Sequence, residues 1–403
     1  MKQLLAYCLS IILCVSFTGC MENYLDLYPE DKITSASFPE NESDIKLLLN
    51  GVYAQLREKE VYNQGLFGFG ITDGATPNAF NWGTDEVFNK LGAGRLSSSD
   101  GGVVTYRWKR CYEIISRANY LLACMDLVDL SEEAKAKYSG ETHFLRGLAY
   151  SVLAETYGGV PIILTNISTE EARSLKRASL EETWQQALDD YEVAITNLGV
   201  DAPEPGRATK GAALGMKMRA YLYQGKYKEV LACVEQIDAL KKYGLFHSYE
   251  GLFDPANENN KEVLFDIQYI EGENSQGSYI DQYCGTGTGS WTRGSRYVPT
   301  DDLVAAYETI DGSPVDPENP YENRDPRLGF TAVLPGSYFL GYRFPNYLYP
   351  GGAFNHAGNR LKHLSTRKYR IQDESKLPPS GQSYINDIIL RYADVLLSKA
   401  EAI

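Results

Sequence analysis

Hydrophobic residues recur at helical spacing along much of the chain. Apolar side chains three or four residues apart define three long segments, 107–126, 131–157 and 179–198. Ser131 is the expected N-cap of the second segment, and Ser179 and Glu182 have the spacing of a capping box at the start of the third. These patterns predict amphipathic helices that pack against one another through their apolar faces.

Two further segments form the clearest predicted helical pair. A helix rich in small residues is expected over 209–224, Gly225 turns the chain, and a return helix is expected over 226–241. In the return helix the pattern places five side chains inward: Tyr227, Val230, Val234, Ile237 and Leu240. The sequence AYLYQGKYKEVLACVEQI, which spans this turn, resembles the middle of a tetratricopeptide repeat. A generic helical bundle without repeat ancestry is the alternative.

The character of the chain changes after residue 243. Glycines alternate with aromatic residues in 269–300 and again in 335–363, and neither stretch has helical periodicity. Long irregular segments in a compact protein usually carry function, and the density of aromatic residues argues against disorder. We therefore expect a mainly α fold, in which a tetratricopeptide-like scaffold of helical hairpins carries a large irregular, loop-rich subdomain.

The first residues have the features of a secretory signal. Lys2 precedes an apolar run over 4–17, and small residues follow before Cys20. Thr18-Gly19-Cys20 resembles the lipobox of bacterial lipoproteins, with Phe17 where a leucine is usual. We expect Cys20 to carry a lipid anchor, because several acyl chains hold a protein stably on a membrane. The alternative is an ordinary signal peptide that is cut elsewhere.

The last residues, 386–403, are periodic and end without a helix cap. We expect a helix that the sequence leaves incomplete, and hence a longer C-terminal part. The expected organisation is a signal peptide (1–19), a helical region (20–243) with an inserted aromatic loop (73–100), an irregular ligand-binding subdomain (244–385) and the start of a further helix (386–403).

Charge and cysteine content exclude several functional classes. The net charge is −14, and it becomes more negative by one when residues 1–19 are removed, because Lys2 is lost. Nucleic-acid binding is therefore not expected, because its usual footprint is a basic face. Four cysteines remain after Cys20, widely spaced and without a C-x-x-C pair, and we interpret them as buried apolar residues: Cys111, Cys124, Cys233 and Cys284.

Two loop segments have the composition of a carbohydrate-binding surface. Asp73–Asn89 and Tyr279–Tyr297 combine aromatic side chains with amides, carboxylates and guanidinium groups between glycines. A pyranose ring stacks its C–H face on an aromatic ring while its hydroxyl groups need planar hydrogen-bonding partners. The candidate ligand residues are Asn81, Trp82, Tyr283, Trp291, Arg293, Arg296 and Tyr297. The alternative is that these aromatic side chains pack the loops onto the scaffold.

Catalytic and metal-binding patterns are weak. The sequence contains no H-E-x-x-H, G-x-S-x-G or phosphate-binding loop, so we expect no enzyme activity, no cofactor and no metal. His143 is expected to be a packed histidine within a helix. Two carboxylate pairs leave an atypical glycoside hydrolase open: Asp85-Glu86 and Asp301-Asp302. Oxygen-bearing side chains that leave a calcium site open are Asp254, Asn257, Asn259 and Glu262.

Ordered motifs along the whole chain resemble those of the SusD/RagB family of glycan-binding lipoproteins. They are the Cys20 anchor, YLDLYPEDKIT (24–34), LLLNGVYAQL (47–56), ETHFLRGLAYSVLAETYGGVPI (141–162), TKGAALGMKMRAYLYQGKYKEV (209–230), NRDPRL (323–328) and RYADVLLSKAEA (391–402). The resemblance implies a tetratricopeptide-like scaffold and ligand aromatics from loops near the two segments above. It also implies a lipid-anchored place on the outer membrane, facing the cell exterior, and a partner, a SusC-like TonB-dependent transporter.

The sequence therefore predicts a surface glycan-binding lipoprotein that delivers an oligosaccharide to an outer-membrane transporter. Two other functions remain open, a glycoside hydrolase of atypical pattern and a non-catalytic helical scaffold at the cell surface. The sequence does not name the glycan.

Overall fold

The computed structural model describes residues 38–57, 73–81, 90–97, 99–272, 277–278, 297–340, 342–343, 364–371, 373–376 and 382–403. The long helices within these residues are α2 (Glu42–Tyr53), α5 (Val103–Cys124), α6 (Glu132–Tyr157), α8 (Leu180–Asn197), α9 (Lys210–Tyr223), α10 (Tyr227–Ala239) and α14 (Tyr392–Ala402). The fold is mainly helical, and the expected fold class is confirmed.

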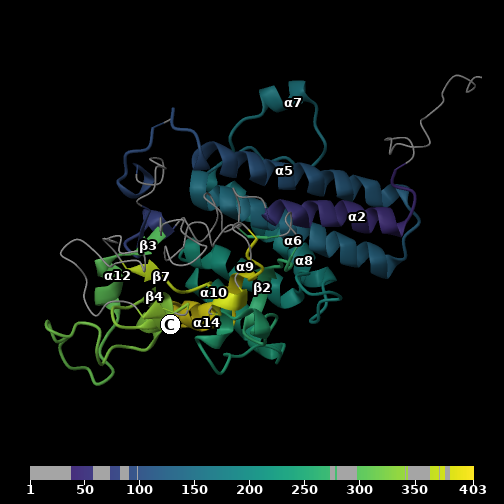
Figure 1. Cartoon of the computed structure of the whole chain (residues 1–403). Coiled ribbons are helices and arrows are strands. Elements are labelled where there is room, and N and C mark those ends of the chain that lie inside the picture. Colours follow the sequence, from purple (N-terminus) through teal and green to yellow (C-terminus); the bar gives the residue numbers. More distant parts are fainter. Residues whose placement is uncertain are drawn as a thin grey trace, which may run out of the picture.

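Helices that follow one another in the sequence pack side by side (Figure 1). α6 contacts both α5 and α8, α8 contacts α9, and α9 contacts α10. α2 packs on α5 and α6, and α14 packs on α10 at the other end of the series. This is the stacking of helical hairpins that the repeat-like sequence predicted.

Side-chain caps determine where the helices begin. The Ser131 hydroxyl accepts a hydrogen bond from the backbone N–H of Ala134 at 3.2 Å. Ser179 and Glu182 form the predicted capping box, in which each side chain accepts from the other residue's backbone N–H. Between α9 and α10, Gly225 adopts a φ of 66°, a conformation that costs glycine little. The predicted boundaries of these helices are confirmed to within about two residues.

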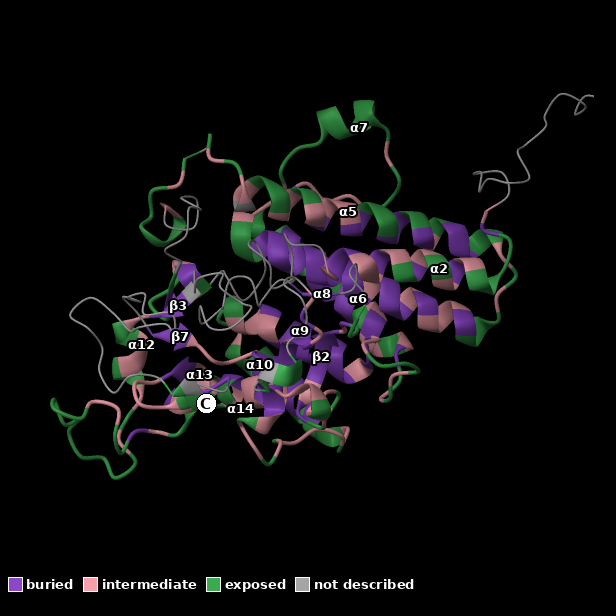
Figure 2. Cartoon of the chain, in the orientation of Figure 1, coloured by how far each residue is buried: buried purple, intermediate pink, exposed green. Residues whose placement is uncertain are grey.

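One continuous core joins the helices (Figure 2). Tyr150, Tyr191 and Phe144 are its largest fully buried side chains. Cys111, Cys124 and Cys233 are buried free thiols, as expected, whereas Cys284 lies outside the described residues. Strands β2 (Val263–Ile267) and β8 (Asp387–Arg391) also contribute to this core, through Phe265 and Leu390 among others.

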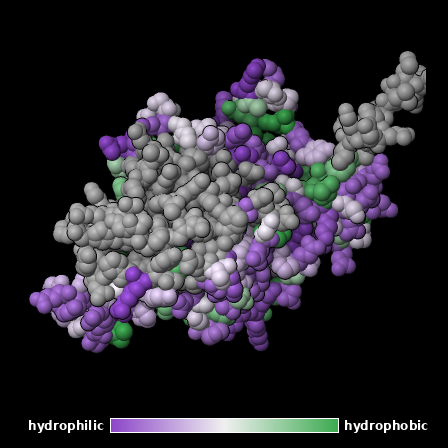
Figure 3. All heavy atoms as spheres, viewed as in Figure 1, coloured by the Kyte–Doolittle hydropathy of each residue, from purple (hydrophilic) through white to green (hydrophobic). Residues whose placement is uncertain are grey.

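The surface over the helices is mainly hydrophilic in the view of Figure 3, as the acidic composition requires. An apolar area lies beside the short helix α7 (Thr169–Ser174) in the same view. Leu164 and Leu175, which flank this helix in the sequence, are 46% and 37% exposed.

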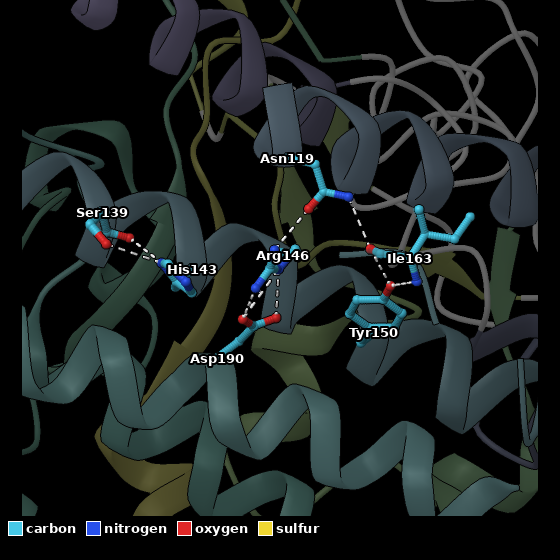
Figure 4. Close-up of polar contacts among 7 residues, drawn as sticks. All are labelled: Asn119, Ser139, His143, Arg146, Tyr150, Ile163 and Asp190. Carbon is cyan, nitrogen blue, oxygen red and sulfur yellow. Dashed lines mark hydrogen bonds and ion pairs between the residues drawn. The ribbon is translucent and has the colours of Figure 1, made fainter. Parts of the chain in front are cut away.

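Figure 4 shows a buried polar network that ties three helices together. Arg146 of α6 donates from Nη2 to a carboxylate oxygen of Asp190 on α8 at 2.7 Å, and from Nη1 to Oδ1 of Asn119 on α5 at 2.8 Å. The Asn119 amide in turn donates to the carbonyl oxygen of Ile163 at 2.9 Å. Because Arg146 and Asp190 are both nearly inaccessible to solvent, each depends on the other for its charge compensation.

Between residues 244 and 385, the described part of the chain forms, besides β2, a series of short helices and strands. They are η4 (Gly251–Phe253), η5 (Pro255–Asn257), β3 (Tyr297–Pro299), α12 (Asp301–Ala306), α13 (Arg327–Thr331), β4 (Ala332–Val333), β5 (Tyr338–Phe339), β6 (Tyr342–Arg343), β7 (Ser365–Thr366) and η6 (Glu374–Lys376). The sheets formed within the described ranges are all two-stranded and antiparallel, namely β1–β3, β2–β8, β4–β7 and β5–β6, where β1 is Ala79–Asn81.

The expectation of a helix throughout 386–403 is wrong in its first part. Asp387–Arg391 forms β8, which pairs with β2, and the helix begins only at Tyr392. The short apolar run Ile388–Leu390 is compatible with a buried strand as well as with a helix. Its pairing with the distant strand β2 makes it a strand. On α14 the buried side chains are Val395 and Ser398, whereas Leu397 is 68% exposed.

One inward assignment in the return helix is also wrong. Tyr227 is 43% exposed at the start of α10, while Val230, Val234 and Ile237 are buried as predicted. Tyr227 is the first residue of α10, and its hydroxyl donates to an exposed carboxylate oxygen of Glu401 on α14 at 3.5 Å, so its ring lies at the surface of the helix pair and periodicity alone misassigns it.

Candidate functional site

The described ends of the two aromatic segments that the sequence singled out pair with each other. β1 pairs with β3 in an antiparallel register that places Asn81 opposite Tyr297 and Phe80 opposite Val298. Residues 79–81 of the first segment and Tyr297 at the end of the second therefore belong to one two-stranded sheet, although they lie far apart in the sequence.

Backbone and hydroxyl contacts hold this sheet in place. The backbone N–H of Thr300 donates to the carbonyl oxygen of Asn78 at 3.1 Å, just beyond the paired strands. The Thr300 hydroxyl accepts from the N–H of Leu303 and so caps α12. β3 also lies beside β7, which pairs with β4. The strands that carry the candidate site are thus part of a larger connected framework.

The structure places the predicted ligand residues only in part. The backbones of Asn81 and Tyr297 are paired, as described above. Trp82 follows Asn81 directly in the sequence, and Arg296 directly precedes Tyr297. The other predicted residues lie outside the described residues. They are Cys20, the expected anchor, and the candidate ligand residues Trp82, Tyr283, Trp291, Arg293 and Arg296.

Phe80 is a further candidate that the sequence interpretation did not select. Its side chain is 43% exposed within β1, while its cross-strand partner Val298 and its neighbour Ala79 are buried. An aromatic ring that remains exposed on a paired strand can serve as a stacking platform for a sugar. The signal was present in the sequence as an aromatic residue beside Asn81 and Trp82.

The NRDPRL segment stabilises the framework beneath the site. Arg324 is buried, and its guanidinium donates to the carbonyl oxygens of Val304 at 2.6 Å, Tyr307 at 2.5 Å and Pro320 at 2.6 Å. The Val304 and Tyr307 carbonyls lie at the end of α12, and the Pro320 carbonyl lies four residues before Arg324, so one side chain ties the end of α12 to the NRDPRL segment. This segment has a structural role in positioning the site.

Carboxylates in the described part of the subdomain serve structural roles. Asp301 and Asp302 are exposed in the first turn of α12, where negative charge suits the helix dipole. Asp85-Glu86, the other pair considered for hydrolysis, lies outside the described residues. The candidate calcium ligands are also engaged separately, since Glu262 pairs with Arg391 and Asp254 accepts from the N–H of Ala256.

Two carboxyl groups at the β2–β8 junction have unusual acidities. Burial raises the pKa of Glu258 to about 7 and the pKa of Asp266 to about 6. Both carboxylates accept hydrogen bonds from Asn386, Glu258 from its backbone N–H at 2.7 Å and Asp266 from its side-chain amide at 3.2 Å. Asn386, which directly precedes β8, thus binds two acidic residues in and before β2. No sequence motif predicted this contact.

His143 matches its expected role as a packed helical residue. Its ring Nδ1 lies 2.8 Å from the carbonyl oxygen of Ser139, one turn earlier in α6, and burial lowers the pKa of the imidazole (Figure 4). In the residues open to description, no group of three or more His, Cys, Asp or Glu side chains is placed to hold a metal ion. No helix among the described elements is long and apolar enough to span a membrane.

Two family models match the chain. The model described as "Starch-binding associating with outer membrane" matches residues 23–222, and the model described as "SusD family" matches residues 261–403. The two matches together include the helices from α2 to α8, most of α9, and the strands β1 and β3 of the candidate site. The chain belongs to the SusD family.

Curated relatives and solved structures of similar proteins are also SusD-like, in agreement with this family assignment. A "SusD-like protein P25" from Formosa agariphila is 26% identical over 74% of this chain, and the chain spans only 58% of that relative's length. A SusD-like carbohydrate binding protein from Bacteroides fragilis is 27% identical, with a TM-score of 0.78 over 90% of this chain and 74% of that one. A laminarin binding SusD-like protein, 20% identical, has the same fold with a TM-score of 0.71 over 90% of this chain and 80% of that one.

Proposed function

We propose that this SusD family member binds an oligosaccharide on the face where β1 and β3 pair. The observation that supports this proposal is the strand register, because Asn81 opposite Tyr297 joins the end of one aromatic segment to the end of the other. The ligand groups are Asn81, Trp82, Tyr283, Trp291, Arg293, Arg296 and Tyr297, with Phe80 added from the structure.

The chemistry of these residues suits weak, reversible capture. One sugar face on an indole removes about 50 Å² of apolar surface, worth about 1 kcal/mol, and favourable stacking adds about 0.5–1.5 kcal/mol. Two or three such platforms with hydrogen bonds reach roughly 4–8 kcal/mol before ordering costs, so the dissociation constant is expected in the millimolar to micromolar range. A capture protein needs such affinities, since it releases its cargo again.

The relatives support a carbohydrate as the ligand class. The Bacteroides fragilis relative is described as carbohydrate binding and shares 27% of its residues with this chain. We propose the same ligand class here, without naming the glycan.

We further propose that the protein is not an enzyme. A glycan array with the purified protein should give binding to a defined set of oligosaccharides, and a reducing-sugar assay on the same glycans should detect no release above the buffer control. Release of reducing sugar would support the glycoside hydrolase alternative. Binding to no glycan at all would support the purely structural scaffold.

Delivery and anchoring complete the proposed function. The protein is proposed to sit on the outer membrane through lipid on Cys20, facing outward, and to pass its ligand to a SusC-like TonB-dependent transporter. Cys20→Ser should move the protein from the membrane fraction to the soluble fraction and abolish labelling with palmitate. Purification of a tagged copy from native membranes in mild detergent should recover an outer-membrane transporter in near-equal amount. Recovery of the tagged protein alone would count against the partnership.

A further inference from the structure

A separate cavity of about 310 Å³ lies in the loop-rich region, at the end of β7. It opens between the 248–254 turn and the segment 367–370, which continues directly from β7. The residues that line it are Ser248, Glu250, Gly251, Phe253, Asp254, Phe330, Arg367, Lys368, Tyr369 and Arg370. Its volume is at the small end of the range for ligand pockets, which suits one sugar ring better than a chain.

Lys368 provides positive charge to this cavity. Its ammonium nitrogen lies 4.5 Å from the ring centroid of Phe253 and 5.3 Å from that of Tyr369. Within the described part of the chain, no carboxylate oxygen lies within the 4.0 Å ion-pair distance of this ammonium group. Cation–π contact compensates the charge only in part, so an anion that reached this nitrogen would gain a charge-assisted hydrogen bond.

The carboxylates on the cavity wall are engaged elsewhere. Glu250 accepts a hydrogen bond from Nη2 of Arg367 at 2.8 Å, and the same guanidinium donates from Nη1 to the carbonyl oxygen of Gly329 at 3.0 Å. Asp254 accepts from the backbone N–H of Ala256 at 2.8 Å. Neither carboxylate therefore neutralises Lys368, and the chemistry of the cavity favours a ligand that brings negative charge.

The aromatic walls are held rigidly. Phe253 is 8% exposed and packs edge-on against Tyr369, with ring centroids 4.8 Å apart, and against Tyr249 at 5.5 Å. Tyr369 adopts a φ of 58°, a left-handed conformation that is uncommon for a residue with a side chain. Packing that maintains this backbone conformation presents the Lys368 and Tyr369 side chains to one cavity, so little ordering is required when a ligand binds.

We propose that this cavity is a second ligand site that takes a sugar unit carrying one negative charge, with the anionic group on Lys368 and the ring among the aromatic walls. The inference goes beyond the glycan face at β1–β3 and does not depend on it. The sequence signal is the basic and aromatic run Arg367-Lys368-Tyr369-Arg370, which motif analysis did not select.

Proton binding gives this site a distinctive pH dependence. Burial and, to a lesser extent, the positive charge of Arg391 lower the pKa of Lys368 to about 8, and the negative charges of Asp73 and Asp387 oppose this shift. The other charged groups on the walls are Arg367, Arg370, Glu250 and Asp254. An anion binds the protonated amine, so affinity should fall about tenfold between pH 7 and pH 9 as the amine loses its proton.

Calorimetry on the purified protein with D-glucuronate tests the proposal. D-glucose serves as the neutral match, and sodium sulfate serves as an anion without a sugar ring. We expect glucuronate to bind at least about tenfold more tightly than either, because charge and ring contacts are both needed. Lys368→Met should weaken glucuronate binding at least about tenfold. Lys261→Met, which removes an exposed lysine elsewhere, should leave it unchanged.

Several outcomes would overturn the proposal. If glucose binds as tightly as glucuronate, the charge of the ligand does not contribute to affinity. If sulfate binds as tightly as glucuronate, the aromatic walls do not contribute to affinity. If Lys368→Met lowers the melting temperature too far for titration, the pH series on the unmodified protein decides, and a flat series contradicts a role for Lys368. A blank glycan array together with retained glucuronate binding would overturn only the function proposed for the β1–β3 face.

Discussion

The helical region and the loop-rich region of this protein are stabilised in different ways. From α2 to α10, regular helices bury a continuous apolar core, as the buried stripes in Figure 2 show. From residue 244 to residue 385, strands of two to five residues pair only two at a time. Here side chains such as Arg324 replace backbone regularity by donating to loop carbonyls.

Because of this difference, we expect substitutions in the helical region to affect mainly stability and substitutions in the loop-rich region to affect mainly ligand binding. Substitutions in the helical region should change the free energy of unfolding because they disturb shared packing. Substitutions at exposed positions of the loop-rich region should change ligand affinity with little effect on unfolding, because few core contacts depend on them.

The largest expected effect is on the buried ion pair of the helical region. Arg146→Met leaves the Asp190 carboxylate buried without its partner and should lower the free energy of unfolding by about 3–5 kcal/mol in urea denaturation. Lys46→Met, in an exposed pair with Glu204, is the matched control and should cost less than about 1 kcal/mol. The double variant Arg146→Met with Asp190→Leu should recover part of the loss. Equal costs for Arg146→Met and Lys46→Met would show that burial of the ion pair does not stabilise the helical region.

The next effect contrasts tryptophans of the candidate site with a tryptophan of the helical core. Trp82→Ala and Trp291→Ala should each weaken oligosaccharide binding by about 1–2.5 kcal/mol, roughly five- to seventyfold, with little change in melting temperature. Trp184→Ala is the contrast, because Trp184 is 5% exposed in the helical core and its loss should cost about 3–5 kcal/mol of stability. Calorimetry measures the oligosaccharide affinity of all three variants, and thermal unfolding measures their melting temperatures.

Two results would contradict this assignment of roles. A large fall in melting temperature for Trp82→Ala or Trp291→Ala would mean that these rings pack the loops onto the scaffold. Unchanged affinity in both variants would move the ligand face elsewhere, and Tyr338, which is 68% exposed on β5, would be the next position to change.

The smallest expected effect is an opposite response to pH. Glu258 and Asp266 have raised pKa values of about 7 and about 6, so the folded protein holds protons that the unfolded chain releases. Their contribution to stability is complete at pH values below the ordinary carboxyl pKa and is lost as the pH rises to about 7. Glu171 and Glu182, in the capping boxes of α7 and α8, have lowered pKa values because they accept hydrogen bonds from Ser168 and Ser179. Their contribution is lost as the pH falls.

Urea denaturation between pH 4 and pH 8 measures this difference. Glu258→Gln keeps the acceptor for the Asn386 N–H and removes one titrating group, so the decline toward pH 8 should shrink by about 1 kcal/mol after allowance for its partial exposure. Glu182→Gln, at an exposed cap, should leave that decline unchanged. An identical decline in Glu258→Gln would show that this carboxyl group does not titrate in the stated window.

Local pattern in the sequence determined the helices and their ends. Ser131 and Ser179 cap their helices as expected, and Gly225 makes the expected turn, because capping and glycine conformation depend on neighbours within a few residues. The family motifs, the mainly helical fold and the acidic surface were likewise accessible from the sequence alone.

Tertiary structure alone decided the contacts between distant segments. Ile388–Leu390 became a strand because β2 supplies its hydrogen-bonding partners, and Tyr227 stayed exposed although its periodicity pointed inward. The register of Asn81 opposite Tyr297, and the meeting of Phe253 with Lys368, join parts of the chain that no local rule relates. Helical periodicity reports which face of one element is apolar, whereas strand pairing and cavity walls depend on partners that only the folded chain brings together.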